Sequence, residues 1–146
     1  MNPNPEDLDV CVEDLRSVCR DAWREGLLSG CNGNASRRLP APRDGLLCVT
    51  RSGAAKGRLT ARDCCLVDAR TGEIHCGGPA SSELGMHLEL YRALPHCGAV
   101  LHSHPRRLLA LSLVVADQED FLRLPLFEAD VWRARLGFAP ALPPGG

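Results

Sequence analysis

The chain has 146 residues, of which 45% are hydrophobic and 24% are charged, and its 17 basic and 18 acidic side chains give a net charge of −1. This size and composition predict one globular domain spanning residues 1–146, and the balanced charge argues against nucleic-acid binding, which needs a basic excess. The sequence has no apolar run long enough for a transmembrane helix, and its acidic N-terminus lacks the hydrophobic region of a signal peptide.

The N-terminal segment is predicted to form an amphipathic helix. Asn4 can cap this helix, and Pro5 suits its first turn. Apolar residues then recur at steps of three and four, the periodicity of a helix with one buried face: Leu8, Cys11, Val12, Leu15, Val18, Cys19, Ala22 and Trp23. Gly26 and Gly30 mark the end of the helix.

The next part of the chain is predicted to contain turns and short strands. Residues 31–39 read as a turn-rich segment, because the dipeptide Asn32-Gly33 favours a turn. A buried strand is expected at residues 46–50. A second strand at 65–68 is expected to form a hairpin with residues 73–75.

The second half of the chain is predicted to add helices and one further strand. Ser81 or Ser82 can cap the first of these helices, and Pro95 ends it. The expected elements are a helix at 83–94, a strand at 98–104, a helix from residue 105 and a short helix around 128–136. This order of helices and strands predicts a layered α/β domain with one sheet between helices.

The eight cysteines are predicted to be free thiols. The absence of a signal peptide favours the cytoplasm, where thiols stay reduced. There is no C-x-x-C pair, so a zinc ribbon has little support. Most of the cysteines lie among Leu and Val, where Cys behaves as a small hydrophobic residue.

The strongest candidate for chemistry is His102-Ser103-His104, at the end of a predicted strand. Residues two apart on a strand project from the same face, so both imidazoles can reach one metal ion. Neutral imidazole is a good zinc ligand. The simpler alternative is a pair of polar residues in a strand-to-helix turn.

Other polar residues are candidates for function only if a metal binds near them. Glu83, at a predicted helix start, is either a capping residue or a general base held near the metal. Three loop dipeptides offer backbone N–H groups and hydroxyls that suit a phosphate, although each alone is an ordinary turn: Gly33-Asn34, Ser52-Gly53 and Ser81-Ser82.

Six short motifs occur in one order along the chain: GNAS at 33–36, TRSG at 50–53, Lys56-Gly57, SSE at 81–83, HLELYRALP at 87–95 and AVLHSH at 99–104. In this order they resemble the class II aldolase/adducin family, which includes L-fuculose-phosphate aldolase and L-ribulose-5-phosphate 4-epimerase. The resemblance covers nearly the whole chain. It implies a three-layer α/β/α fold with a central, mainly antiparallel sheet, of which the C-terminal part is expected to be missing.

The resemblance also implies roles for individual residues. His102 and His104 match two of three zinc-ligating histidines, and Glu83 matches the acid/base carboxylate. The residues that match the phosphate-binding loops are Gly33, Asn34, Ser52, Gly53, Ser81 and Ser82. The implied cofactor is one Zn²⁺ per subunit, with another divalent metal possible.

The sequence departs from the family pattern in two places. The third zinc histidine belongs to a His-Gly motif that this sequence does not contain, so the third ligand is open. Of the remaining histidines, His87 reads as a helix-packing residue, and His75 and His96 lie in a hairpin and a turn. Arg51 stands where the family often has proline, so the loop is expected to differ there.

The implied function is a zinc-dependent aldehyde-lyase that cleaves or forms a C–C bond in a phosphorylated sugar, such as a deoxy-ketose 1-phosphate, through a metal-stabilised enediolate. The alternatives are an epimerase or dehydratase acting on a pentulose phosphate with the same metal site, or an inactive adducin-like interaction domain. A Schiff-base aldolase using Lys56 is disfavoured, because its glycine-flanked loop is expected to be solvated. The family implies a cytoplasmic homotetramer, with no nucleic-acid or membrane partner.

Overall fold

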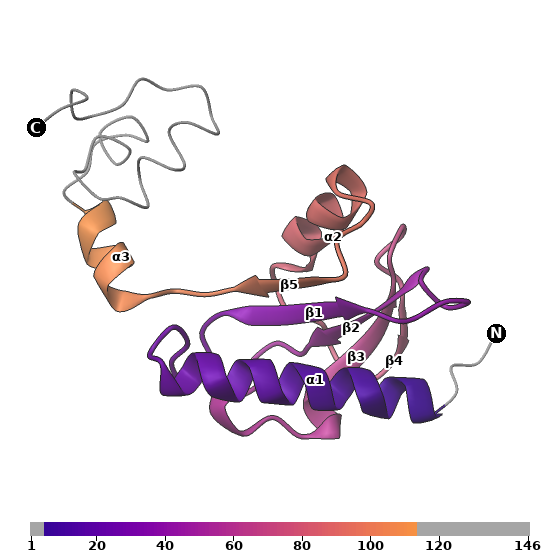
Figure 1. Ribbon diagram of the computed structural model, residues 1–146, viewed down its shortest axis with the longest axis horizontal. Helices are drawn as coiled ribbons and strands as arrows, with labels where there is room; N and C mark the ends of the chain where they lie inside the picture. Colours follow the sequence, from indigo (N-terminus) through magenta and orange to yellow (C-terminus); the bar gives the residue numbers. More distant parts are fainter. Residues whose placement is uncertain (1–4, 114–146) are drawn as a thin grey trace, which may run out of the picture. The chain divides into compact units, whose positions relative to one another are not determined.

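The computed structural model describes residues 5–113, and Figure 1 shows the arrangement of their helices and strands. The chain divides into two compact units, Met1–Pro105 and Arg106–Gly146. The first unit contains α1 (Pro5–Arg24), β1 (Asn34–Arg38), β2 (Leu46–Thr50), β3 (Cys64–Asp68), β4 (Ile74–Cys76), α2 (Leu84–Ala93) and β5 (Ala99–His102), with short 3₁₀ turns at Lys56–Arg58 and Ala61–Asp63. The second unit contains α3 (Arg106–Ser112).

The five strands form one sheet in the order β4-β3-β2-β1-β5, and all neighbouring strands are antiparallel. The predicted hairpin is therefore confirmed as β3 and β4. The prediction of turns throughout residues 31–39 is wrong, because β1 lies between β2 and β5. Asn, Ser and Arg are weak strand formers, but pairing with strands on both sides overrides that preference. Ser36, for example, is opposite Val49 on β2 and Val100 on β5.

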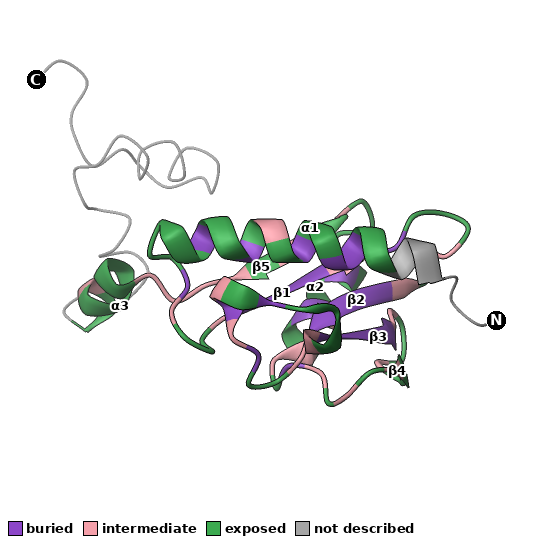
Figure 2. Cartoon of the chain, turned by 90° about the horizontal axis from the view of Figure 1, so that it is seen from below, coloured by how far each residue is buried: buried purple, intermediate pink, exposed green. Residues whose placement is uncertain are grey.

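Helix α1 covers one face of the sheet, and its buried residues alternate with exposed ones along its length (Figure 2). The buried residues are Cys11, Val12, Leu15, Cys19 and Ala22, which share a core with Ala35, Cys48 and Leu66. The buried face predicted for this helix was too wide, since Val18 and Trp23 are 48% and 49% exposed. Trp23 lies at the rim of the contact face, where its ring packs against Gly57.

Helix α2 serves a second core on the other face of the sheet. Its Tyr91 is buried with Leu47, Val49, Cys65 and Val67, and Leu84 and Leu88 pack against this cluster. Helices on both faces of an antiparallel sheet confirm the predicted α/β fold. The helix begins at Leu84, one residue later than predicted, and the Ser81 hydroxyl accepts a hydrogen bond from the Glu83 backbone N–H at 3.3 Å.

All eight cysteines are free thiols, as predicted, and five of them are buried: Cys11, Cys19, Cys48, Cys64 and Cys65. Burial raises the pKa of Cys19 and of Cys65 to about 11, so both stay protonated and pack as apolar groups. Within residues 5–113, no helix has the length and apolar character needed to cross a membrane. The helix predicted around 128–136 lies outside the described residues.

Candidate functional site

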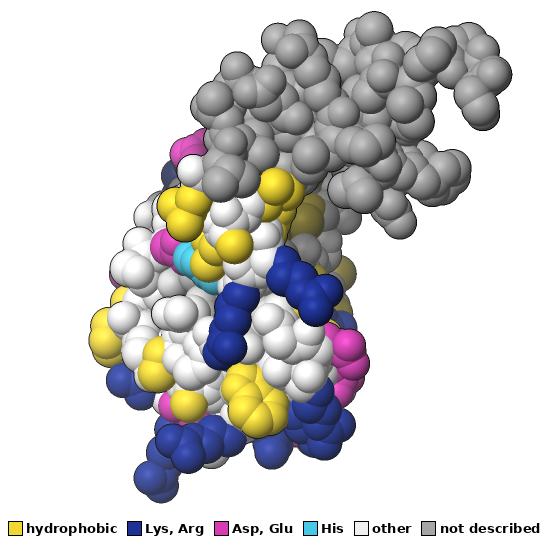
Figure 3. All heavy atoms as spheres, turned by 90° about the vertical axis from the view of Figure 1, so that its left-hand side faces the viewer, with side chains coloured by type: hydrophobic (Ala, Val, Ile, Leu, Met, Phe, Trp, Pro, Cys, Tyr) yellow, Lys and Arg dark blue, Asp and Glu magenta, His cyan; other side chains and the backbone are white. Residues whose placement is uncertain are grey.

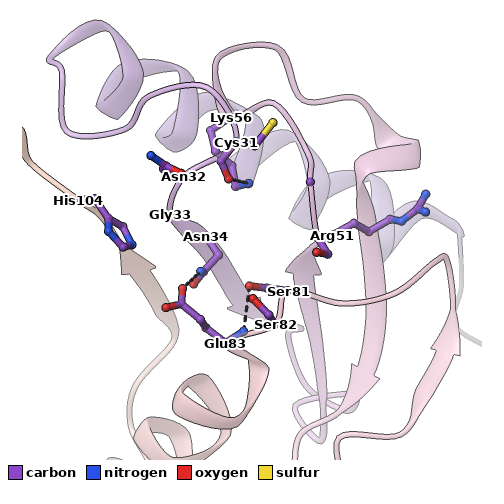
Figure 4. Close-up of a pocket in the computed structure, with 12 residues that line it drawn as sticks. Cys31, Asn32, Gly33, Asn34, Arg51, Lys56, Ser81, Ser82, Glu83 and His104 are labelled. Atoms are coloured by element: carbon purple, nitrogen blue, oxygen red, sulfur yellow. Dashed lines mark hydrogen bonds between the residues drawn. The ribbon is translucent and has the colours of Figure 1, made fainter.

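One cavity of about 270 Å³ opens where the segments before β1, after β2, before α2 and after β5 meet. All six residues predicted to bind phosphate line it: Gly33, Asn34, Ser52, Gly53, Ser81 and Ser82. Glu83 and His104 line the same cavity, and Figure 4 shows how the side chains lie around it. The fold thus brings together residues that are up to 71 positions apart in the sequence.

Gly33 is required where the chain enters β1. Its φ angle is +73°, in the left-handed region that disfavours side chains. A Cβ atom here would lie 2.5 Å from the Leu28 side chain and 2.6 Å from the carbonyl oxygen of His102. Glycine therefore allows the cavity wall to approach the backbone of a predicted metal ligand.

Replacing Gly33 by alanine should destabilise the fold by more than the roughly 1–2 kcal/mol that a left-handed conformation alone costs. The additional loss comes from the collision with the His102 carbonyl. Gly26→Ala is the matched control, because Gly26 has φ +72° and no atom within 4 Å of its would-be Cβ. Chemical denaturation of both variants measures the difference, and equal losses would refute the steric explanation.

Glu83, His102 and His104 come together beside this cavity. One potential ligand atom from each lies within 4.8 Å of the others, and the two imidazole centroids are 4.6 Å apart. Figure 3 shows histidine atoms beside acidic side-chain atoms on one face of the surface. His104 lies beyond β5, so the same-face argument for a continuous strand does not apply to it. The strand ends at His102, and Pro105 lacks the N–H group that a longer strand would need at that position.

The three donor groups fit a zinc ion or a similar divalent metal. Two imidazoles and a carboxylate are all ligand types that zinc accepts. The Nδ1 atom of His102 donates a hydrogen bond to Glu83 Oε2 at 2.7 Å, so its Nε2 atom is the one available to a metal. A carboxylate on the far nitrogen is a common way to orient a histidine ligand.

The carboxylate of Glu83 is held by two donors. Asn34 Nδ2 and His102 Nδ1 both donate to its Oε2 atom. The Asn34 hydrogen bond is the largest cause of the lowered pKa of Glu83; burial opposes it, and the hydrogen bond from His102 lowers the pKa further. Glu83 occupies the N-cap position of α2 without making a side-chain capping bond, so its carboxylate serves this site instead.

A buried hydrogen-bonded chain, not predicted from the sequence, runs from Glu83 into the core. Asn34 must donate through Nδ2 to the carboxylate, so its Oδ1 accepts from His87 Nε2. His87 Nδ1 then accepts from the Ser36 hydroxyl at 2.7 Å, and Ser36 accepts from Tyr91 at 2.9 Å. His87 is fully buried, so it is a hydrogen-bonding residue as well as a packing residue.

Replacing His87 by leucine should cost about 1–3 kcal/mol at pH 8, because Asn34 and Ser36 each lose a partner. Burial, reinforced by the charge of His102, lowers the pKa of His87 below its ordinary 6.5. As pH falls below 6.5, the unfolded wild type therefore takes up a proton on His87 before the folded form does, and the stability that neutral His87 gives the fold is lost. The difference in free energy of unfolding between wild type and His87→Leu should shrink from pH 8 to pH 5 in urea titrations. A constant difference would contradict this assignment.

Lys56 contradicts the expectation of a solvated loop. Its side chain is only 1% exposed, because Nζ donates to the carbonyl oxygens of Cys31 and Ala54 inside the fold. Arg51, which also lines the cavity, turns its side chain away from the other labelled residues (Figure 4) and donates to the Arg62 carbonyl at 2.8 Å.

Comparisons with known proteins agree with this arrangement. Residues 13–143 match the family described as Class II Aldolase and Adducin N-terminal domain. The chain is 34% identical over 134 residues to L-fuculose phosphate aldolase of Methanococcus vannielii, covering 92% of this chain and 68% of that protein. It is 38% identical over 117 residues to methylthioribulose-1-phosphate dehydratase of Gluconacetobacter diazotrophicus, covering 80% of this chain and 55% of that protein.

Solved structures give the same assignment. L-fuculose-1-phosphate aldolase from Thermus thermophilus superposes with a TM-score of 0.58 at 37% identity, covering 70% of this chain and 50% of that one. YgbL from Klebsiella pneumoniae gives a TM-score of 0.64 at 32% identity, covering 72% and 49%. With the ordered motifs, the α/β fold and the family match in agreement, the chain belongs to the class II aldolase and adducin N-terminal domain family.

Proposed function

We propose that this chain carries the metal and phosphate sites of a zinc-dependent lyase that acts on a phosphorylated sugar. The observation that supports this most is the convergence of Glu83, His102 and His104 beside a cavity lined by hydroxyls and loop backbone. The reaction we favour is the aldolase reaction, which cleaves or forms a C–C bond. The chain spans about half to two thirds of the relatives it matches, so the activity of the whole protein is part of the proposal.

Each group has a role in this proposal. His102 and His104 would hold the metal, which when bound acts as a Lewis acid on the substrate oxygens. The loops around Gly33, Ser52 and Ser81 would bind the phosphate and fix the position of the sugar, which lowers the entropic part of the barrier. Glu83 would carry a proton to or from the reacting carbon, since its carboxylate is ionised, 39% exposed and fixed by two hydrogen bonds.

A dehydratase is the second candidate, because relatives at 38% identity over 117 residues carry that name. The same metal and phosphate groups would serve a reaction in which water leaves the sugar. We further propose, from the family resemblance alone, a homotetramer working in the cytoplasm. Sedimentation of the purified protein tests the oligomeric state.

Elemental analysis followed by two assays tests the proposal. We expect zinc near one ion per chain, and turnover of either L-fuculose 1-phosphate or methylthioribulose 1-phosphate. Release of an aldehyde from the first would identify an aldolase, and loss of water from the second would identify a dehydratase. Zinc binding without turnover of any phosphorylated ketose would favour the interaction-domain alternative.

A further inference from the structure

The only lysine of the chain is buried in the wall of the cavity. Lys56 begins a short 3₁₀ turn, and its backbone N–H donates to the Gly30 carbonyl at 3.1 Å. Its Nζ atom donates to Cys31 O at 3.2 Å and to Ala54 O at 2.7 Å. One side chain therefore ties together the loop before β1 and the loop after β2, which form two sides of the cavity.

Among the side chains that the structure describes, those of residues 9–113, Lys56 has no acidic partner at ion-pair distance. None of their carboxylate oxygens lies within 4.0 Å of Nζ, and Asp63 acts on it only at longer range. An ammonium carries three donors, of which two carbonyl oxygens take two. Burying an unpaired charge is costly, so the arrangement favours a negative charge arriving from outside the protein.

Among the described residues that line the cavity, no second cation faces it in the same way. Arg51 is the other strongly basic residue of this described lining, and its guanidinium points away (Figure 4). Lys56 instead lies at the same wall as the Cys31–Asn34 backbone and Ser52-Gly53, whose N–H and hydroxyl groups are uncharged donors. A fixed positive charge behind such donors strengthens binding of a doubly charged anion more than that of a neutral sugar.

We propose that Lys56 supplies the positive charge of the anion site and selects a phosphate monoester dianion as the part of the substrate bound there. This inference rests on the proposed phosphate site, and it gives that site its charge. Burial lowers the pKa of Lys56, and a bound dianion would hold the proton on Nζ. The two carbonyl acceptors hold Nζ in place as a charged donor, which favours an electrostatic role over nucleophilic attack.

Binding of inorganic phosphate to the wild type and to Lys56→Met tests the inference. We expect Lys56→Met to bind phosphate at least about tenfold more weakly, because charge-assisted hydrogen bonds are the stronger ones. Its zinc content should stay unchanged. Arg58→Met is the matched control, since it removes one positive charge from an exposed residue in the same turn, outside this cavity. Equal phosphate affinity of Lys56→Met and wild type would overturn the inference.

A single lysine also allows a test on the unaltered protein, in case Lys56→Met does not fold. Protein labelled with ¹³C,¹⁵N-lysine gives one lysine side-chain signal by NMR. Added phosphate should shift this signal and raise the melting temperature of the protein over the same range of phosphate concentration. A lysine signal that stays fixed while phosphate stabilises the protein would overturn the inference and leave the proposed function standing. Wild-type protein that binds zinc but no phosphate would overturn the inference, whereas a lack of zinc and turnover would overturn only the proposed lyase.

Discussion

Glu83→Gln should retain zinc and lose turnover by a factor of about 10²–10⁴, the usual contribution of a positioned acid/base group. Glutamine keeps the shape of glutamate, and its carbonyl oxygen can still accept hydrogen bonds from Asn34 and His102. It cannot take up a proton at the reacting carbon. Zinc content and steady-state turnover on the same preparation separate these two effects.

Glu89→Gln is the control for this variant, because Glu89 lies on the exposed side of the same helix and pairs with Arg92. It should leave both zinc and turnover unchanged. Full turnover in Glu83→Gln would show that another group moves the proton. Loss of zinc from Glu83→Gln would instead make Glu83 a metal ligand, which its place beside His102 and His104 also allows.

His102→Ala and His104→Ala should each remove the bound metal and reduce lyase activity to background. With the carboxylate of Glu83, these two imidazoles make up the whole candidate ligand group found among the described side chains, those of residues 9–113. Removing one of them leaves too few protein ligands to hold zinc tightly. Elemental analysis of dialysed protein and the activity assay measure the two losses together.

His75→Ala and His96→Ala are the matched controls, because both histidines are exposed and lie outside the cavity. They should keep the zinc content and activity of the wild type. A zinc content near one ion per chain in either His102→Ala or His104→Ala would contradict the assignment of that residue as a ligand.

The candidate site residues were singled out by the order of several short motifs, not by one local pattern. His102 and His104 stand two residues apart, and Glu83 directly follows two serines, but each pattern alone left a simpler alternative open. The two outer helices of the first unit and the hairpin follow from local periodicity. These features are encoded within windows of a few residues.

Features that depend on distant pairing were missed. Strand β1 has the composition of a turn, and only its neighbours β2 and β5 make it a strand. Lys56 stands between alanine and glycine, and one of the two carbonyl groups that hold its buried Nζ belongs to Cys31, 25 residues earlier in the chain. Asn34, the hydrogen-bond partner of His87 Nε2, lies 53 residues earlier in the chain, so no local sequence pattern predicts this contact.

The hydrogen-bonded chain behind Glu83 has a direction, and this constrains how the protein can evolve. Tyr91, Ser36, His87 and Asn34 each donate a hydrogen bond to the next group in the direction of the Glu83 carboxylate. A substitution that keeps the shape of one member but exchanges a donor for an acceptor places two donors, or two acceptors, opposite each other at the neighbouring hydrogen bond. These positions are therefore expected to change in concert among descendants, as a linked set rather than as independent sites.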